Sequence, residues 1–346
     1  MKKTLGIFLL MVVILVLTGL YDPAFISAGN VTNMIKWSAL YGILALGVCF
    51  VITTGGIDLS MGSMVCLVGV IFAMTLVKFY DSFSVSMSSF GAKASAFALA
   101  SLIAIAISVI IGIFHGILIT KVKLQPFVVT LCGLFIYRGL SRQIANDQNQ
   151  GLGSNFDELS KGLISHQTWI IPSIFFILVV FGVIAAIFLN KTTYGRYLLA
   201  LGRNEKAAKF SGIKTDRMII MSYIICACLA GIGAIFFVFE LKTVQPSIHG
   251  NFYELYAIAG AVLGGCSLRG GECSISGVIC GAALVEVIKN AVFFLGVDPK
   301  SEFTIIGIII LLGVAFDEIL RRFSEVNKAK KNAKNLDGSN KVESVA

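Results

Sequence analysis

Long apolar segments recur along almost the whole chain, and no other feature limits the possible folds as strongly. An α-helix needs about 20 apolar residues to cross the hydrocarbon core of a bilayer. Apolar segments, some of them shorter than this, occupy residues 5–20, 38–54, 64–77, 94–120, 126–138, 169–190, 218–239, 255–263, 275–295 and 303–320. The sequence therefore predicts an all-α polytopic membrane protein with about ten transmembrane helices, in a transmembrane domain over residues 1–320.

The composition agrees with a membrane protein and argues against other classes. Hydrophobic residues make up 57% of the chain and charged residues only 14%. The net charge of +9 does not call for a nucleic-acid partner, because membrane proteins concentrate Lys and Arg in their cytoplasmic loops. The eight cysteines contain no CxxC pair, the three histidines are far apart, and no nucleophile–base constellation is recognisable. We therefore expect a membrane protein with no catalytic, cofactor-binding or metal-binding residues, and not an enzyme.

The distribution of basic residues predicts the orientation of the chain. Lys2 and Lys3 precede the first apolar segment, which is long for a signal peptide and lacks a clear cleavage site. With the N-terminus inside, 19 of the 28 Lys and Arg fall in inner segments, eight in outer segments and only Lys289 within a span. This balance predicts cytoplasmic N- and C-termini. Residues 321–346 form a polar, basic tail that we expect to be disordered.

The segment 191–217 is the one long, strongly basic connector between two apolar segments. It carries seven Lys and Arg against two acids, which predicts a cytoplasmic location. Asn204 is suited to cap a helix, Glu205 is favourable in the first turn, and Gly212 can supply a left-handed stop. We expect a helix of about two turns here.

The apolar side chains of this short helix leave two interpretations open. Ala207, Ala208 and Phe210 would form a small patch suited to the groove of another protein. The segment could equally be an ordinary solvated loop that its charge keeps inside.

Two glycine-rich breaks interrupt the apolar pattern. The first is TTGGIDLSMGS (53–63), and the second is GGCSLRGGE (264–272). Their glycines and leucines align at one constant offset: Gly55, Gly56, Leu59 and Gly62 with Gly264, Gly265, Leu268 and Gly271. This alignment suggests an internal duplication with broken or re-entrant helices, although glycines also recur at ordinary membrane bends. Whether the two copies run parallel or inverted stays open.

The breaks supply candidates for the translocation path. They are Gly55, Gly56, Asp58, Ser60, Gly62, Gly264, Gly265, Gly270 and Gly271. Asp58 is either a functional ionisable group or a cap for the following helix. Glu286 and Lys289 are spaced to form an ion pair within a span, either as a structural tie or protomer contact or as part of a substrate site.

Four segments in order resemble one family. They are TTGGIDLSMGS (53–63), PFVVTLCGLFIYRGL (126–140), GRYLLALGRNEKAAKFSGIK (195–214) and YELYAIAGAVLGGCSLRGG (253–271). Together they resemble the membrane permease subunits of bacterial ABC importers for simple sugars, of the ribose, galactose and xylose type. The resemblance extends from about Ala24 to Asp317.

The resemblance implies a complex in the bacterial cytoplasmic membrane. Its other members would be a cytoplasmic ATP-binding cassette ATPase, a second permease subunit and an extracytoplasmic sugar-binding protein. The chain contains no GxxxxGK[ST] loop, so ATP and Mg²⁺ would be bound by the ATPase. The resemblance assigns the coupling loop to Gly195, Arg196, Gly202, Asn204, Glu205, Ala207, Ala208 and Gly212.

Three departures from the family pattern concern the predicted path. Tyr256 stands where an Asp is usual, His115 replaces an Asn, and Lys289 to Ala291 replaces an Asn-Asn-Gly. The solute could therefore be an autoinducer-type furanosyl signal, a nucleoside or a polyol in place of ribose. An ion-driven secondary transporter is the alternative from another class, but it calls for paired carboxylates deep within spans, and the sequence offers few.

Overall fold

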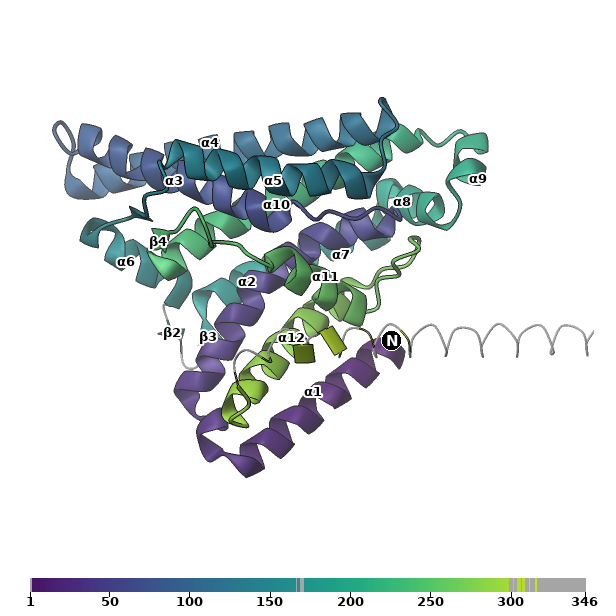
Figure 1. The fold of residues 1–346 in the computed structure, drawn as a ribbon, viewed down its shortest axis with the longest axis horizontal. Coiled ribbons are helices and arrows are strands. Elements are labelled where there is room, and N and C mark those ends of the chain that lie inside the picture. Colours follow the sequence, from purple (N-terminus) through teal and green to yellow (C-terminus); the bar gives the residue numbers. More distant parts are fainter. Residues whose placement is uncertain are drawn as a thin grey trace, which may run out of the picture. The chain divides into compact units, whose positions relative to one another are not determined.

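Helix α2 (Ala28–Thr53) lies at the centre of the helical bundle in the computed structural model of the protein (Figure 1). Its residues from Ala39 to Thr53 are all buried, as expected of a helix that is apolar around its whole circumference. The helices that pack around it are α7 (Ser173–Lys191), α10 (Thr215–Leu241), α11 (Tyr253–Leu263) and α12 (Ile275–Phe294). The structure describes residues 2–298 except 166, 169 and 170, and after these only 301, 304, 305, 307, 308, 311 and 315.

Six of the described helices are long and apolar enough to cross a membrane. They are α2, α3 (Met61–Phe83), α4 (Ser89–Thr120), α7, α10 and α12. Leu5–Tyr21 in α1 (Lys2–Tyr21) and helix α11 are shorter apolar helices, and α5 (Pro126–Ile144) occupies the fifth expected segment. The prediction of a helical, multi-pass membrane protein is confirmed. The tenth expected segment, 303–320, and the tail fall almost entirely outside the described residues, so the number ten stays a prediction.

Helix α2 begins at Ala28, well before the apolar segment 38–54 that the sequence indicates. The turn η1 (Pro23–Ile26) precedes it, and the Ser27 hydroxyl accepts a hydrogen bond from the Asn30 amide. Polar side chains of its first turns are paired with other helices: Asn30 with Asn290 at 2.8 Å, and Lys36 with Glu240 at 2.6 Å. Such pairing allows polar residues to extend a buried helix, which the hydropathy of the segment alone does not reveal.

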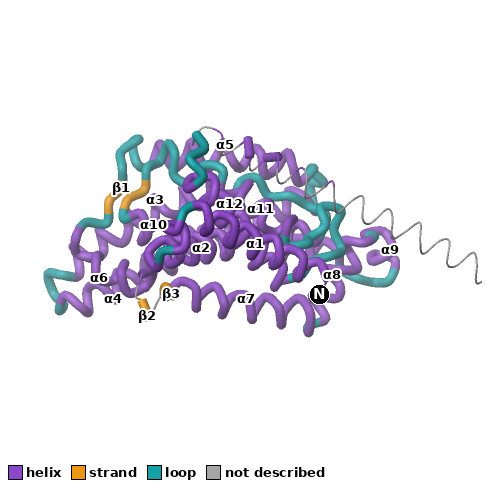
Figure 2. The backbone as a smooth tube through the Cα atoms, turned by 90° about the horizontal axis from the view of Figure 1, so that it is seen from below, coloured by secondary structure: helices purple, strands orange, loops and turns teal. Residues whose placement is uncertain are grey.

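The connecting segments gather at two ends of the unit formed by residues 1–297. Helices α8 (Thr193–Arg203) and α9 (Glu205–Phe210) and the N-terminus lie at one end (Figure 1). At the other end, β1 (Gln150–Gly151) pairs with β4 (Thr243–Val244), and β2 (Gln167–Thr168) pairs with β3 (Ile171–Pro172), all antiparallel (Figure 2). The segment between α5 and α7 thus contains short strands and the helix α6 (Asp157–Ser160).

An exposed ion pair links α6 to the end of α10, and its effect should depend on pH. Asp157 lies 2.6 Å from Lys242, whose hydrogen bond lowers the pKa of the Asp157 carboxyl below its usual 3.8. A carboxyl whose pKa is lower in the folded state stabilises the fold at pH values above its unfolded-state pKa. This stabilisation is lost as the pH falls through the folded-state pKa. We expect Asp157→Asn to lower the melting temperature slightly at pH 7, with the difference disappearing below pH 3.8.

Thermal unfolding in detergent across this pH range measures the effect. Asp81→Asn is the control, because Asp81 is an exposed acid of α3 with no ion pair among the described residues. Equal melting temperatures of Asp157→Asn and the unmodified protein at pH 7 would contradict the prediction.

Candidate functional site

The predicted two-turn helix of the basic connector is present as α9. The Asn204 side chain accepts a hydrogen bond of 3.0 Å from the Ala207 amide, and Gly212 has φ +82°. The amides of Gly212 and Ile213 donate to the carbonyls of Lys209 and Ala208, both at 3.1 Å. This Schellman pattern satisfies the last carbonyls of the helix. The predicted N-cap and stop of α9 are therefore confirmed.

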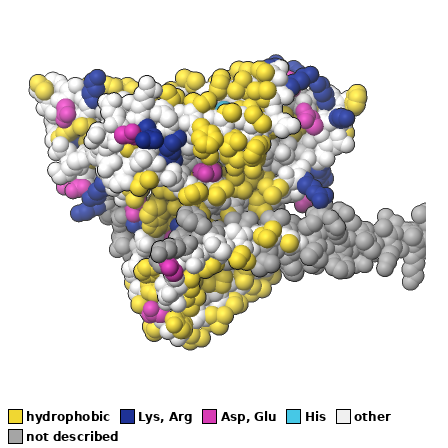
Figure 3. All heavy atoms as spheres, in the orientation of Figure 1, with side chains coloured by type: hydrophobic (Ala, Val, Ile, Leu, Met, Phe, Trp, Pro, Cys, Tyr) yellow, Lys and Arg dark blue, Asp and Glu magenta, His cyan; other side chains and the backbone are white. Residues whose placement is uncertain are grey.

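Helix α9 exposes a different surface from the one that the sequence predicts. Ala208 is only 5% exposed, so it packs inward, whereas Ala207 is exposed and Phe210 is 93% exposed. Basic side chains gather at this end of the face in Figure 3, while hydrophobic side chains cover much of its middle. A hollow of about 440 Å³ adjoins α9 and is lined by Tyr197, Ser211, Gly212, Ile213, Lys214, Arg217 and Met218.

The C-terminal end of α8 contacts both glycine-rich breaks. A side-chain carbon on Gly202 would collide with the Thr53 carbonyl oxygen and the Gly271 amide nitrogen. That amide donates a hydrogen bond of 2.9 Å to the same carbonyl. A Cβ on Gly270 would lie 2.8 Å from the Gly55 nitrogen and 2.9 Å from the Gly202 oxygen. We call Gly55, Gly202, Gly270 and Gly271 the glycine junction, in which backbone meets backbone. A side chain would collide at Gly202, Gly270 and Gly271, whereas Gly55 favours glycine through its φ of +81°.

The helices before the two breaks end in the same way. The amides of Gly55 and Gly56 donate to Ile52 and Val51, and those of Gly265 and Cys266 donate to Val262 and Ala261. Both ends are Schellman motifs, with φ +81° at Gly55 and +95° at Gly265. Gly55 is thus the structural counterpart of Gly265, one residue away from the alignment that the sequence suggested.

Helices α11 and α12 cross at a pair of small-residue motifs. Gly260 on α11 and its C-cap residue Gly264 approach Gly277 and Gly281 on α12 so closely that a Cβ on Gly264 would lie 2.5 Å from the Gly277 oxygen. Close backbone approach of this kind is the packing mode of GxxxG motifs in membrane helices. It holds the short helix α11 against a helix that is long enough to span.

A buried polar cluster lies beside the first break. The Asp58 carboxylate is 1% exposed and accepts hydrogen bonds from the Ser60 amide at 2.9 Å and the Ser60 hydroxyl at 2.7 Å. Ser60 is the N-cap of α3, so Asp58 fixes the residue before the helix and does not cap its free amides directly. Asp58 thus supports the start of α3 indirectly, by holding its N-cap residue Ser60.

Helices α4, α5 and α10 complete the buried polar cluster. The Tyr137 hydroxyl lies 2.7 Å from His115 Nε2, and the Tyr223 hydroxyl donates to the Ile57 carbonyl at 3.1 Å. The Cys226 thiol contacts the Asp58 carboxylate at 3.7 Å. The cluster therefore joins the first break to three other helices.

The predicted ion pair on α12 exists and has aromatic neighbours. Lys289 lies 3.5 Å from Glu286, whose side chain is 7% exposed. The Lys289 ammonium also lies 5.0 Å from the ring centre of Tyr41 and 4.6 Å from that of Tyr256. Such distances fit cation–π contacts. Two departures from the family pattern, Tyr256 and Lys289, thus contact each other.

Neutralising Lys289 alone should destabilise the protein more than neutralising both partners. Lys289→Met leaves the Glu286 charge without its cation in a buried place, which costs about 3–5 kcal/mol for typical buried pairs. We expect Glu286→Gln with Lys289→Met to recover most of this loss. Thermal unfolding in detergent tests it, with Lys78→Met, an exposed lysine of α3, as the control.

Transport assays on the same variants separate the two roles of the pair. Recovery of both stability and transport in the double variant indicates a structural tie. Recovered stability with transport still lost indicates contact with the solute. A single Lys289→Met variant as stable as the Lys78→Met control would contradict the buried pair.

Comparisons with known proteins identify the family. The family model "Branched-chain amino acid transport system / permease component" matches residues 30–314. The ribose import permease protein of Bacillus subtilis (strain 168) is 34% identical over 91% of this chain and 92% of its own length. The galactose/methyl galactoside import permease protein of Escherichia coli (strain K12) is 30% identical over 91% and 94%. The chain belongs to this family of ABC-importer permeases.

A third relative extends the range of sugars in these names. The fructose import permease protein of Bifidobacterium longum (strain NCC 2705) is 30% identical over 82% of this chain and 76% of its own length. No solved structure matches. The permease is thus a transporter subunit of the simple-sugar type and not an enzyme.

The structure brings only part of the predicted site together. Four predicted residues from three distant segments meet in the glycine junction, and Asp58 and Ser60 lie in the buried polar cluster. Gly56 adjoins that cluster, because a Cβ there would lie 2.9 Å from the Tyr223 hydroxyl. Gly62 lies elsewhere, against Gly250 and Glu254.

The remaining coupling-loop residues have mainly local roles in the permease. Gly195 packs against the Leu189 backbone, whereas Arg196 and Glu205 are exposed. Helix α8, Tyr137 and Tyr223 contribute to these contacts but were not predicted from the sequence, whereas His115 had been noted as a departure near the predicted path. The pattern of Leu198 and Leu201, three apart and both buried, was the available signal for α8.

Proposed function

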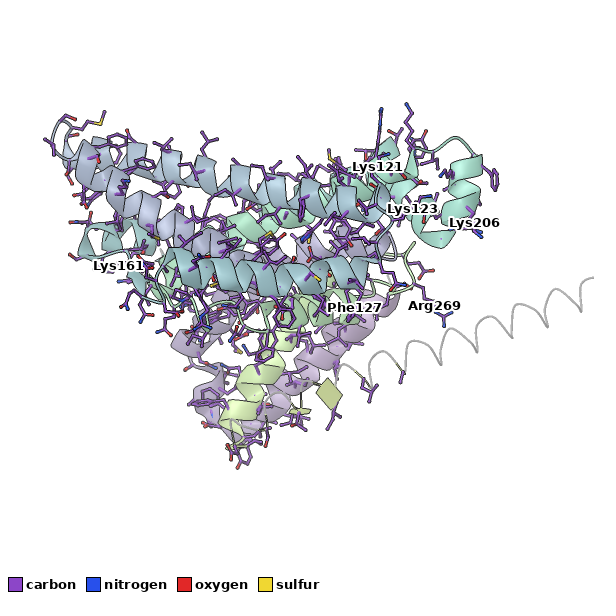
Figure 4. The ribbon with its side chains drawn as sticks, turned by 45° about the horizontal axis from the view of Figure 1, so that its top comes forward. Lys121, Lys123, Phe127, Lys161, Lys206 and Arg269 are labelled. Atoms are coloured by element: carbon purple, nitrogen blue, oxygen red, sulfur yellow. The ribbon has the colours of Figure 1, made fainter. Side chains whose placement is uncertain are left out.

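We propose that the permease forms the path for a simple sugar, ribose-like in size, that an extracytoplasmic binding protein delivers. The names of its relatives support a monosaccharide as the solute. We place it in the bacterial cytoplasmic membrane, with its termini and the α8–α9 end in the cytoplasm. In Figure 4, Lys121, Lys123, Lys206 and Arg269 lie at that end, where the positive-inside rule favours basic residues, and Lys161 lies at the other.

The partner at the cytoplasmic end is an ATP-binding cassette ATPase, which binds ATP and Mg²⁺. Helix α9 would enter its groove with the exposed ring of Phe210, while the hollow beside α9 receives a projecting segment of the ATPase. Lys206, Lys209 and Arg217 are exposed around this surface. The charge favours an acidic rim on the ATPase.

The glycine junction is the observation that carries the proposed coupling mechanism. When the ATPase moves α9, Gly202 at the end of α8 moves against backbone atoms of both breaks. Because no flexible side chain separates them, a displacement of the loop passes directly to the starts of α3 and α12. The buried polar cluster beside the first break would then rearrange as the path alternates between its two openings.

A second permease subunit completes the proposed path. Helix α5 supports this assembly, since one of its faces is exposed along its length and carries Phe127, Cys132, Phe135, Ile136 and Gly139. Small residues among large apolar ones suit helix contacts between subunits.

Purification with the ATPase tests the function. The permease is expressed with and without the ATPase, and hydrolysis is followed in detergent with binding protein that is empty or loaded with ribose, galactose, a nucleoside or a polyol. We expect a stable complex whose hydrolysis rises with one sugar-loaded binding protein. A permease that purifies alone and moves solute in liposomes under an ion gradient would overturn the proposal.

A further inference from the structure

Two thiols face each other across the second break. Cys266 Sγ lies 3.1 Å from Cys273 Sγ, and both cysteines are free. The residues between them form a tight loop, because the Ser267 amide donates a hydrogen bond of 3.1 Å to the Glu272 carbonyl. Cys266 and Cys273 flank this backbone pair and therefore occupy opposite positions on the two strands of the loop.

This geometry is close to that of a disulfide. The S–S bond is about 2.05 Å long, so the two sulfur atoms need to approach by only about 1 Å. Rotation of the side chains can supply most of this movement, since opposite positions already bring the Cβ atoms near each other.

The two thiols differ in access. Cys266 is 3% exposed, whereas Cys273 is only partly buried and follows the exposed Glu272. A small oxidant from the aqueous phase can therefore reach Cys273 first, with Cys266 behind it as the resolving thiol. Accessible cysteines with a resolving partner are the usual arrangement of reversible thiol oxidation.

The loop between the thiols contains half of the glycine junction. Gly270 and Gly271 lie between Cys266 and Cys273, and they contact Gly55, Gly202 and Arg203. A covalent bond at the base of this loop would restrict the segment on which the junction depends.

We propose that Cys266 and Cys273 form a dithiol modification site for oxidants of the peroxide class, and that the resulting disulfide locks the second break. The Cys273 sulfur attacks one peroxide oxygen, which gives a sulfenic acid and one water. The Cys266 sulfur then displaces the hydroxyl from that sulfenic acid, forming the S–S bond and a second water. Two thiols and one hydrogen peroxide thus become one disulfide and two waters.

A cellular dithiol reverses the reaction, as expected for a transient cytoplasmic disulfide. The effect on transport rests on the proposed function, but the chemistry does not.

Mass analysis of the full-length permease in its complex with the ATPase tests the chemistry. The complex is treated with hydrogen peroxide, alkylated, digested and compared with an untreated sample. We expect Cys266 and Cys273 to be joined, unalkylated and lighter by two hydrogen atoms, while Cys280, a partly buried thiol of α12, is alkylated as before. Separate alkylation or separate oxidation of Cys266 and Cys273 overturns the proposal.

Solute-stimulated ATP hydrolysis tests the locking effect. We expect peroxide to remove most of this stimulation in the unmodified complex and a dithiol reductant to restore it. Cys266→Ser and Cys273→Ser should resist peroxide, and Cys228→Ser, at a partly buried thiol of α10, should behave like the unmodified complex. Equal loss in all four proteins, or a disulfide that forms with no loss, contradicts locking. If the untreated complex shows no stimulation, the proposed function fails while the mass analysis still decides the dithiol site.

Discussion

Replacing Gly202 by alanine is expected to abolish solute-stimulated ATP hydrolysis while the permease still inserts into the membrane. The added methyl group would collide with the Thr53 carbonyl and the Gly271 amide, which already share a hydrogen bond of 2.9 Å. Overpacking costs about 1–3 kcal/mol where side chains can yield, and backbone atoms yield less. The end of α8 must therefore separate from the breaks. We expect at least a tenfold loss of transport, since about 1.4 kcal/mol already corresponds to tenfold.

Gly29→Ala is the matched control for this variant. Gly29 also lies in a helix, but no atom from another described segment lies within 4 Å of a Cβ placed there. Alanine should be tolerated or slightly stabilising at that position. Transport, stimulated hydrolysis and thermal stability are measured for both variants. If Gly202→Ala transports like Gly29→Ala, the glycine junction does not couple the loop to the breaks.

Replacing Phe210 by aspartate should weaken ATPase binding without affecting the fold. The ring is 93% exposed, so its removal leaves no cavity in the permease. Large aromatic side chains at the centre of an interface commonly contribute 2 kcal/mol or more, which corresponds to roughly 30-fold in affinity. The acidic group would also oppose an acidic rim on the ATPase. We expect the dissociation constant of the detergent complex to rise by about this factor and transport to fall with it.

Val85→Asp is the control for the aspartate itself. Val85 is 88% exposed in the connection between α3 and α4, so the substitution adds the same charge at another exposed apolar position. Both variants should melt at the temperature of the unmodified permease. If Phe210→Asp binds the ATPase with unchanged affinity, α9 is not part of the docking surface.

The features of this fold that sequence alone predicted are those that depend on neighbouring residues. The cap at Asn204 and the stop at Gly212 were predicted because both act within one turn of helix α9. The pairing of Glu286 with Lys289 follows from helical spacing. The membrane class follows from the apolar segments, which need no tertiary information.

Features that depend on tertiary contacts were missed or placed inaccurately. The start of α2 was missed because Asn30 and Lys36 become compatible with a buried helix only through α12 and α10. Ala208 was assigned to an exposed apolar patch on α9, although the packing of α9 turns it inward. The alignment of the two breaks was one residue off, since the left-handed residue after each helix, Gly55 or Gly265, is the true point of correspondence.

The glycine junction has an evolutionary consequence. Its contacts are made by main-chain atoms, so they depend on the presence of glycine at four positions and not on the identity of the surrounding side chains. Residues of the proposed path, such as His115, Tyr256 and Lys289, can therefore diverge while the proposed connection to the ATPase is retained. A lineage of such permeases could change its transported solute by ordinary point mutation and continue to use the same ATPase.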